Sequence, residues 1–179
     1  MNLQSVYIIL LMTIAINCSA ESNKVAILYS DVMLEHRTGE NHPEKPERLS
    51  SAVSTIKKNN ALSKYFIWPA ITKASNDYIQ LAHTDDYINL VKSEVERLDG
   101  DQQVLLSTGD VVISKNSDEA ARFAVGAGIA GIDQIMAKKA ASAFALVRPP
   151  GHHATSTRGM GFCVYNNIAV AAKYLQKEY

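Results

Sequence analysis

Apolar and polar residues alternate along the chain in blocks that predict strands separated by helices. Residues 25–29 form a short apolar run, which is typical of a buried strand. The unbroken apolar run over residues 143–147 lies between a pair of lysines and a pair of prolines, and it predicts a central parallel strand covered on both faces. Residues 66–71 predict a weaker strand, because Pro69 cannot donate a hydrogen bond to a neighbouring strand.

Two amphipathic helices are predicted in the first half of the chain. Pro46 suits the first turn of one helix, and the asparagines at positions 59 and 60 end it. Thr84 suits the N-cap of a second helix, which extends to residue 98. Apolar residues recur along this second helix at helical spacing, and we expect them to be buried. They are Tyr87, Ile88, Val91, Val95 and Leu98.

Two more helices are predicted in the second half. Asn116, followed by Glu119 three residues later, predicts a capping box at the start of a helix over residues 116–139. This helix contains three glycines, each of which costs about 1 kcal/mol relative to alanine, so we expect close packing against a sheet. They are Gly126, Gly128 and Gly131. With a last helix over residues 167–176, the alternation of strands and helices predicts an α/β fold with a parallel sheet.

Length and charge narrow the class of protein. The chain has 179 residues, of which 47% are hydrophobic, so one domain with one core is expected. Lys and Arg together number 18, as do Asp and Glu, and the sequence shows no cluster of basic residues. This balance gives no electrostatic support for direct nucleic-acid binding.

The first 20 residues differ from the rest of the chain. Residues 6–16 form an uncharged, mostly apolar run, which is shorter than the roughly 20 residues that a bilayer span needs. Together with the small residues before Glu21, this run predicts a secretory signal peptide over residues 1–20 and a secreted or periplasmic protein. A retained helix in a cytoplasmic protein is the alternative, because no Lys or Arg precedes the run. After cleavage Cys163 would be the remaining cysteine, which excludes an intrachain disulfide and a cysteine-clustered zinc site.

Two adjacent histidines in the loop after the predicted strand 143–147 are the first candidates for chemistry. Ligands of open α/β sheets bind in loops beyond the carboxyl ends of the strands, and His152 and His153 lie in such a loop. Imidazole, with a reference pKa of about 6.5, suits proton transfer near neutral pH. Two neighbouring imidazoles need different environments to act as base and donor. Taken alone, the pair is also explained by loop histidines that bond to the backbone.

The histidine loop is part of a longer pattern. Residues 148–154 read Arg-Pro-Pro-Gly-His-His-Ala, residues 159–163 read Gly-Met-Gly-Phe-Cys, and two asparagines follow at 166 and 167. This pattern closely resembles the zinc-dependent histone deacetylase family, on the side that includes the acetylpolyamine amidohydrolases. Shorter signatures extend the resemblance over nearly all of residues 24–179. They are His36 with residues 37–39, His42 with Pro43 and Glu44, Pro46, Arg48, His83 with Thr84, Tyr87, Asp110 and Ser117.

The resemblance implies a three-layer α/β/α architecture of the arginase–deacetylase type, with a mostly parallel sheet. Residues 21–179 would supply its N-terminal part. The implied activity is a hydrolase that releases acetate from an acetyl-lysine protein or an acetylated polyamine, with Zn²⁺, or alternatively Fe²⁺, in the complete domain. By resemblance, His153 is the general base and then acid, and His152 is its electrostatic partner and hydrogen-bond donor.

The same resemblance implies roles in substrate binding. Phe162 and the Gly161 backbone would line a narrow tunnel for the acyl-lysine chain. Asp110 would hold the substrate backbone at the rim, although Val111 follows it where the family often has threonine. Arg48 would lie below the active site, near an exit channel for acetate.

The family's metal-binding residues have no counterpart in this sequence. The family holds its metal through an Asp-x-His pair on a later strand and a further Asp, and neither Asp nor His follows His153 here. One interpretation is a fragment of an active amide hydrolase. A second is a catalytically inactive remnant that binds an acetylated ligand or a partner protein without turnover. A third is a half-sheet that aggregates through its open edge. The sequence leaves the oligomeric state open.

Overall fold

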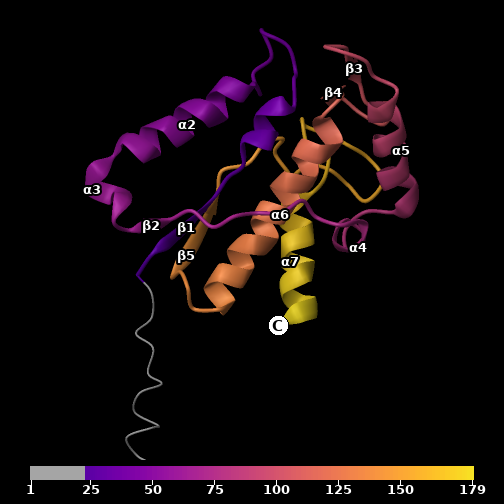
Figure 1. Cartoon of the computed structure of the whole chain (residues 1–179). Helices are drawn as coiled ribbons and strands as arrows, with labels where there is room; N and C mark the ends of the chain where they lie inside the picture. The colour runs from indigo at the N-terminus through magenta and orange to yellow at the C-terminus, as the bar shows by residue number, and fades with distance from the viewer. Residues whose placement is uncertain (1–22) are drawn as a thin grey trace, which may run out of the picture.

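The computed structural model describes residues 23–179, and the predicted signal peptide over residues 1–20 lies outside them (Figure 1). Strands and short helices alternate with long helices along the chain. In order, the elements are β1 (Val25–Leu28), a 3₁₀ helix η1 (Asp31–Glu35), α2 (Pro46–Lys58), α3 (Asn60–Ser63), β2 (Phe66–Ile67), α4 (Asn76–Ile79), α5 (Asp85–Glu96), β3 (Gln103–Leu105), β4 (Val112–Ser114), α6 (Ser117–Met136), β5 (Ser142–Ala145) and α7 (Asn167–Glu178). Within residues 23–179, no helix is long and apolar enough to cross a membrane.

A three-stranded parallel sheet forms the centre of the fold, in the order β2-β1-β5. Leu49 and Val53 of α2 lie in one core with β1 and with Met33 of η1, and α6 packs on β1 and β5. Helix α7 lies beside α6 (Figure 1). This arrangement confirms the predicted α/β fold with a parallel sheet between helical layers. The antiparallel hairpin β3–β4 lies apart from the sheet, and no sequence pattern predicted it.

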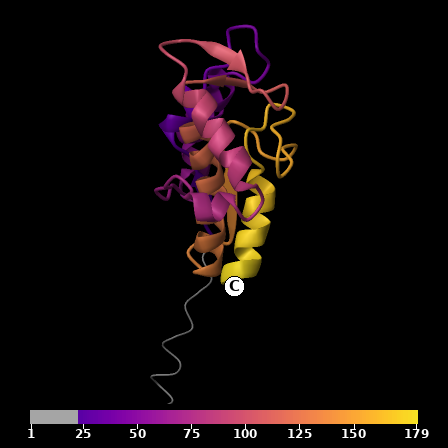
Figure 2. The same cartoon turned by 90° about the vertical axis from the view of Figure 1, so that its right-hand side faces the viewer.

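A second core lies between α5, α6 and α7, with α5 over the outer side of α6 (Figure 2). Thr84 accepts a hydrogen bond from the Tyr87 backbone N–H at 3.3 Å, which confirms the predicted cap of α5. The predicted apolar side of α5 is also confirmed, because its five residues are at most 7% exposed. Val91 and Ile88 lie in this core with Val125 of α6 and Val170 of α7.

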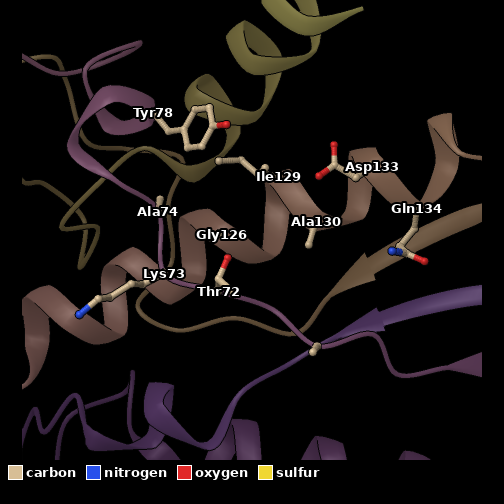
Figure 3. Close-up of a pocket in the computed structure, with 10 residues that line it drawn as sticks. Thr72, Lys73, Ala74, Tyr78, Gly126, Ile129, Ala130, Asp133 and Gln134 are labelled. Carbon is tan, nitrogen blue, oxygen red and sulfur yellow. The ribbon is translucent and has the colours of Figure 1, made fainter.

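The three glycines of α6 each allow a close approach, but only one of them packs on the sheet. A Cβ atom on Gly131 would lie 3.1 Å from the Cβ of Ala143 in β5. A Cβ atom on Gly126 would lie 1.9 Å from the carbonyl oxygen of Thr72, so the segment before α4 crosses α6 at this glycine (Figure 3). Gly128 instead faces α7. The helix therefore packs closely on three sides rather than on the sheet alone.

Three local predictions were wrong. The strand predicted at residues 143–147 is β5, which lies at the edge of the sheet, because no strand within residues 23–179 pairs with its outer side, and Phe144 on one of its faces is 53% exposed. The strand predicted at 66–71 ends at Ile67, since Pro69 has no N–H for a ladder. The capping box also fails: within the described residues, the Asn116 side chain caps nothing, and the Ser117 hydroxyl accepts the Ser114 N–H at 2.7 Å.

Candidate active site

The histidine loop begins at the carboxyl end of β5, where Arg148 fixes it to the first loop of the chain. The Arg148 side chain is 1% exposed, and its Nε donates to both oxygens of Glu44, at 3.0 and 3.2 Å. Its Nη1 donates to the carbonyl oxygens of Met33 and His36, at 3.1 and 2.5 Å. The Arg148–Pro149 peptide bond is cis. This buried ion pair therefore joins two segments that are 104 residues apart.

His152 and His153 lie side by side at the surface of this loop. Their ring centroids are 4.2 Å apart, and both side chains are exposed. Their backbone N–H groups donate to the Sγ atom of Cys163, at 3.4 and 3.5 Å. The backbone of the pair is thus held from inside the protein, while the imidazoles remain open to a ligand.

The loop over residues 159–163 brings Gly161 against the pair. A Cβ atom on Gly161 would lie 2.7 Å from Cδ2 of His153, so a larger residue would displace that imidazole. The Phe162 ring packs edge-on against His42 of the first loop, with 4.7 Å between centroids. Gly161 therefore lies against His153, and the next residue, Phe162, connects this loop to the first loop through His42.

Asp110 lies next to the same loop, at the turn between β3 and β4. Its Oδ1 atom accepts the Gly161 N–H at 2.9 Å, and this contact is exposed. The structure therefore brings together four of the predicted site residues: His153, His152, Gly161 and Asp110.

Arg48 lies on a different surface. Its side chain is 64% exposed, and Nη1 lies 3.8 Å from Oε1 of Glu44. It lines a pocket of about 230 Å³ together with Glu44, Arg148, residues of α2 and the end of β5. Arg48 is therefore joined to the histidine loop through the Glu44–Arg148 pair, which is compatible with the predicted role below the site.

A buried hydrogen-bond chain supports the first loop. His36 Nδ1 lies 2.7 Å from the Ser117 hydroxyl, and Nε2 lies 4.0 Å from Glu44 Oε2. Burial, with the charge of Arg148, lowers the pKa of His36 to about 3. The Ser117 oxygen also accepts the Ser114 N–H and lies 3.1 Å from the Ser114 hydroxyl, so His36 is joined to β4 through Ser117. The sequence marked His36 only as part of a signature.

His83 fixes the other end of the site. It is 4% exposed, and its Nε2 accepts the Asn166 N–H at 2.8 Å. Burial lowers the pKa of His83 to about 4, so the imidazole is neutral near pH 7 and can accept this bond. Asn166 in turn caps α7 by accepting the Ala169 N–H at 3.0 Å. This function of His83 was missed, since the sequence does not show which backbone group meets its ring.

Another pocket, of about 220 Å³, lies between α6 and the segment before α4 (Figure 3). Tyr78 and Asp133 are among its lining residues. The Asp133 carboxylate accepts hydrogen bonds from the hydroxyl groups of Tyr174 and Tyr179, at 2.8 and 3.1 Å. The Asp133 carboxylate therefore has partners in the protein, and none of the predicted site residues line the pocket.

The described residues do not fit a metal ion. Within residues 23–179, no three or more His, Cys, Asp or Glu side chains lie close enough together to hold one. A catalytic zinc site usually takes three ligands from the protein. The arrangement offers a pair of accessible imidazoles beside Gly161.

Comparison with known proteins shows the family and how much of its domain is present. The histone deacetylase domain family matches residues 42–179. Histone deacetylase 5 of Arabidopsis thaliana is 35% identical over 159 residues, covering 87% of this chain and 24% of its own length. Polyamine deacetylase HDAC10 of Danio rerio is 33% identical over 138 residues, covering 76% of this chain and 20% of its own.

Two further matches show how much of the domain is present. An uncharacterized protein of Synechocystis sp. is 37% identical over 153 residues, covering 84% of this chain and 48% of its own. The crystal structure of the HDA15 HD domain superposes with a TM-score of 0.77 at 29% identity, covering 86% of this chain and 43% of that one. The chain spans about half, or less, of the length of these relatives. It belongs to the histone deacetylase domain family, and residues 42–179 make up part of that domain.

Proposed function

We propose that the chain supplies the histidine loop and one tunnel wall of a deacetylase that releases acetate from an acetylated amine. The observation that carries this proposal is the contact between Gly161 and His153. A side chain at position 161 would meet the imidazole at 2.7 Å, so the wall and the proposed base form one surface. The names of relatives support both substrate classes, acetyl-lysine in histones and acetylated polyamines.

In this proposal the chain's own residues handle protons and orient the acyl chain. His153 accepts a proton from the attacking water and delivers it to the leaving amine, as general base and then acid. His152 donates a hydrogen bond and contributes charge. Phe162 and the Gly161 backbone hold the acyl chain, and Asp110 contacts the substrate at the rim. The family typically uses zinc, whose ligands we place outside residues 23–179.

A second candidate function is binding without turnover. The observation that favours it is that no group of three or more His, Cys, Asp or Glu side chains that could hold a metal occurs among the described residues. The chain would then bind an acetylated ligand at the Phe162 wall but would not cleave it. We also propose that the protein is exported if the segment over residues 1–20 is cleaved.

A chimera separates these functions. Residues 23–179 are joined to the part of the Synechocystis relative that lies beyond its match with this chain, and folding is checked by circular dichroism. We expect the zinc-loaded chimera to release acetate from an acetyl-lysine peptide, an acetylpolyamine or both, and the 179-residue chain to release none. A folded chimera that releases no acetate with zinc, iron or cobalt contradicts the enzyme. Binding of an acetylated peptide to the chain alone, without turnover, supports the second candidate.

A further inference from the structure

We propose that Cys163 and Asp110 are positioning residues that together hold the Gly161–Phe162 turn against His153. This inference deepens the proposed function and relies on it for its relevance to turnover. The geometry that supports it comes from the chain itself, and its test needs no turnover.

The turn needs support because its backbone is in the left-handed region. Gly161 has φ +55° and Phe162 has φ +68°. Glycine adopts such angles readily, but for a bulky residue such as phenylalanine they are unfavourable. Such residues persist where the surrounding structure fixes them, and they gather at functional sites. The groups that bond to this turn therefore determine where the Phe162 ring lies.

Cys163 supports the turn from inside the protein. It is completely buried, and its thiol donates to the Gly161 carbonyl oxygen at 3.5 Å. The same sulfur accepts the backbone N–H groups of His152 and His153. One proton donated and two accepted match what a neutral thiol can offer. A single atom thus connects the histidine pair with the tunnel wall.

Asp110 supports the turn from outside. Its carboxylate accepts the Gly161 N–H at 2.9 Å, so both backbone polar groups of Gly161 are bound, one by each positioning residue. Thr108, on the same side, accepts the Gly159 N–H at 3.3 Å. Val111 next to Asp110 is completely buried, which anchors the hairpin that carries both contacts. Asp110 therefore has a partner in the protein besides the substrate contact that the resemblance implies.

Amide hydrogen exchange, measured by NMR on the full chain, tests the two contacts separately. In Asp110→Ala we expect the Gly161 amide to exchange at least about tenfold faster, because its acceptor is gone. Asp110→Asn keeps an acceptor oxygen and should restore exchange to within a few-fold of the parent. Asp101→Asn is the matched control, since Asp101 is an exposed aspartate shortly before β3 that pairs with Arg37. This variant should not change the exchange of the Gly161 amide.

Cys163→Ala should speed exchange at the amides of His152 and His153 and weaken the nuclear Overhauser contacts between the Phe162 and His42 rings. Cys163→Ser serves if the alanine variant does not fold. The shorter reach of its oxygen should still disturb the amides of His152 and His153 and the bond to the Gly161 carbonyl oxygen, because hydroxyl hydrogen bonds are shorter than the 3.4–3.5 Å seen at sulfur. Unchanged Gly161 exchange in Asp110→Ala, or unchanged His152 and His153 amides in a folded Cys163 variant, would overturn the proposal. Loss of turnover in the chimera would leave these local readouts unaffected, so the two proposals fail separately.

Discussion

At the carboxyl end of β5, Arg148 is 1% exposed and bonded to Glu44, whereas Phe144 within the strand is 53% exposed. The two positions are only a few residues apart. Ala143 faces α6 at Gly131, so Phe144 points to the opposite face of the sheet. The loop end of β5 is thus held by the buried Arg148–Glu44 pair, while the outer edge of the strand has no neighbouring strand within residues 23–179.

Helix α7 repeats this contrast. Val170 and Tyr174 are buried against α6, but another side of the helix carries an exposed apolar row. Its residues are Ile168, Ala172 and Leu175, spaced at i, i+4 and i+7. Such a row is normally buried. The comparison teaches that the candidate site is built from contacts inside this chain, whereas the β5 edge and the α7 row present surface that suits a further packing partner.

The largest expected effect comes from breaking the buried ion pair. Arg148→Met should lower the free energy of unfolding by about 3–5 kcal/mol, because Glu44 is left charged and buried without its partner. Adding Glu44→Leu should recover part of that loss. Denaturant unfolding measures both. The matched control is Arg37→Met, whose exposed pair with Asp101 should be worth about 0–1 kcal/mol. Equal losses in the two arginine variants would contradict the claim that the buried ion pair stabilises the fold more than the exposed one.

The second largest effect is expected from acid, which should lower the free energy of unfolding through two buried histidines. The pKa of His36 is lowered to about 3 and that of His83 to about 4, against about 6.5 for histidine in an unfolded chain. Between those values the unfolded chain binds protons that the folded chain does not, so the free energy of unfolding should decrease as pH falls below about 6.5. Urea unfolding at several pH values measures this slope. His36→Asn should make it shallower, and an unchanged slope would show that His36 is not buried and neutral.

The smallest effect on stability is expected at the exposed apolar side chains of β5 and α7. Phe144→Ser and Ile168→Ser should each change the free energy of unfolding by about 0.5 kcal/mol or less, because both side chains are mostly exposed. Both should reduce self-association, measured by light scattering, since they remove apolar surface. Leu62→Ser is the control, because Leu62 is 45% exposed on the separate helix α3. If Leu62→Ser reduced self-association equally, the exposed side chains of β5 and α7 would have no special role in it.

The sequence predicted the parts of the fold that depend on periodicity. Helix α5 was predicted with its cap and apolar side, because helical spacing and the Thr84 signal are local. The hairpin β3–β4 was missed because Gln103–Leu105 has three residues, all on the exposed side of the protein, and is too short to show an alternation. The prediction that β5 is a central strand was wrong, because the residues of a strand do not show whether a neighbouring strand is present.

For the site, the sequence motif identified residues but not their partners. It marked His152, His153 and Gly161, which the structure brings together. It did not reveal that Arg148 bonds to Glu44, since a contact across 104 residues leaves no local pattern. Nor did it reveal that Cys163 bonds to both histidine backbones.

The most direct test of the central claim compares His153→Ala with His152→Ala in the chimera that carries residues 23–179. General acid–base catalysis contributes about 10²–10⁴-fold, so His153→Ala should lower kcat by that order and by more than His152→Ala. Neither variant should change the metal content, because the proposed ligands lie elsewhere. Near-normal turnover in both variants, or loss of the metal in His153→Ala, would contradict the assignment of this pair to proton transfer.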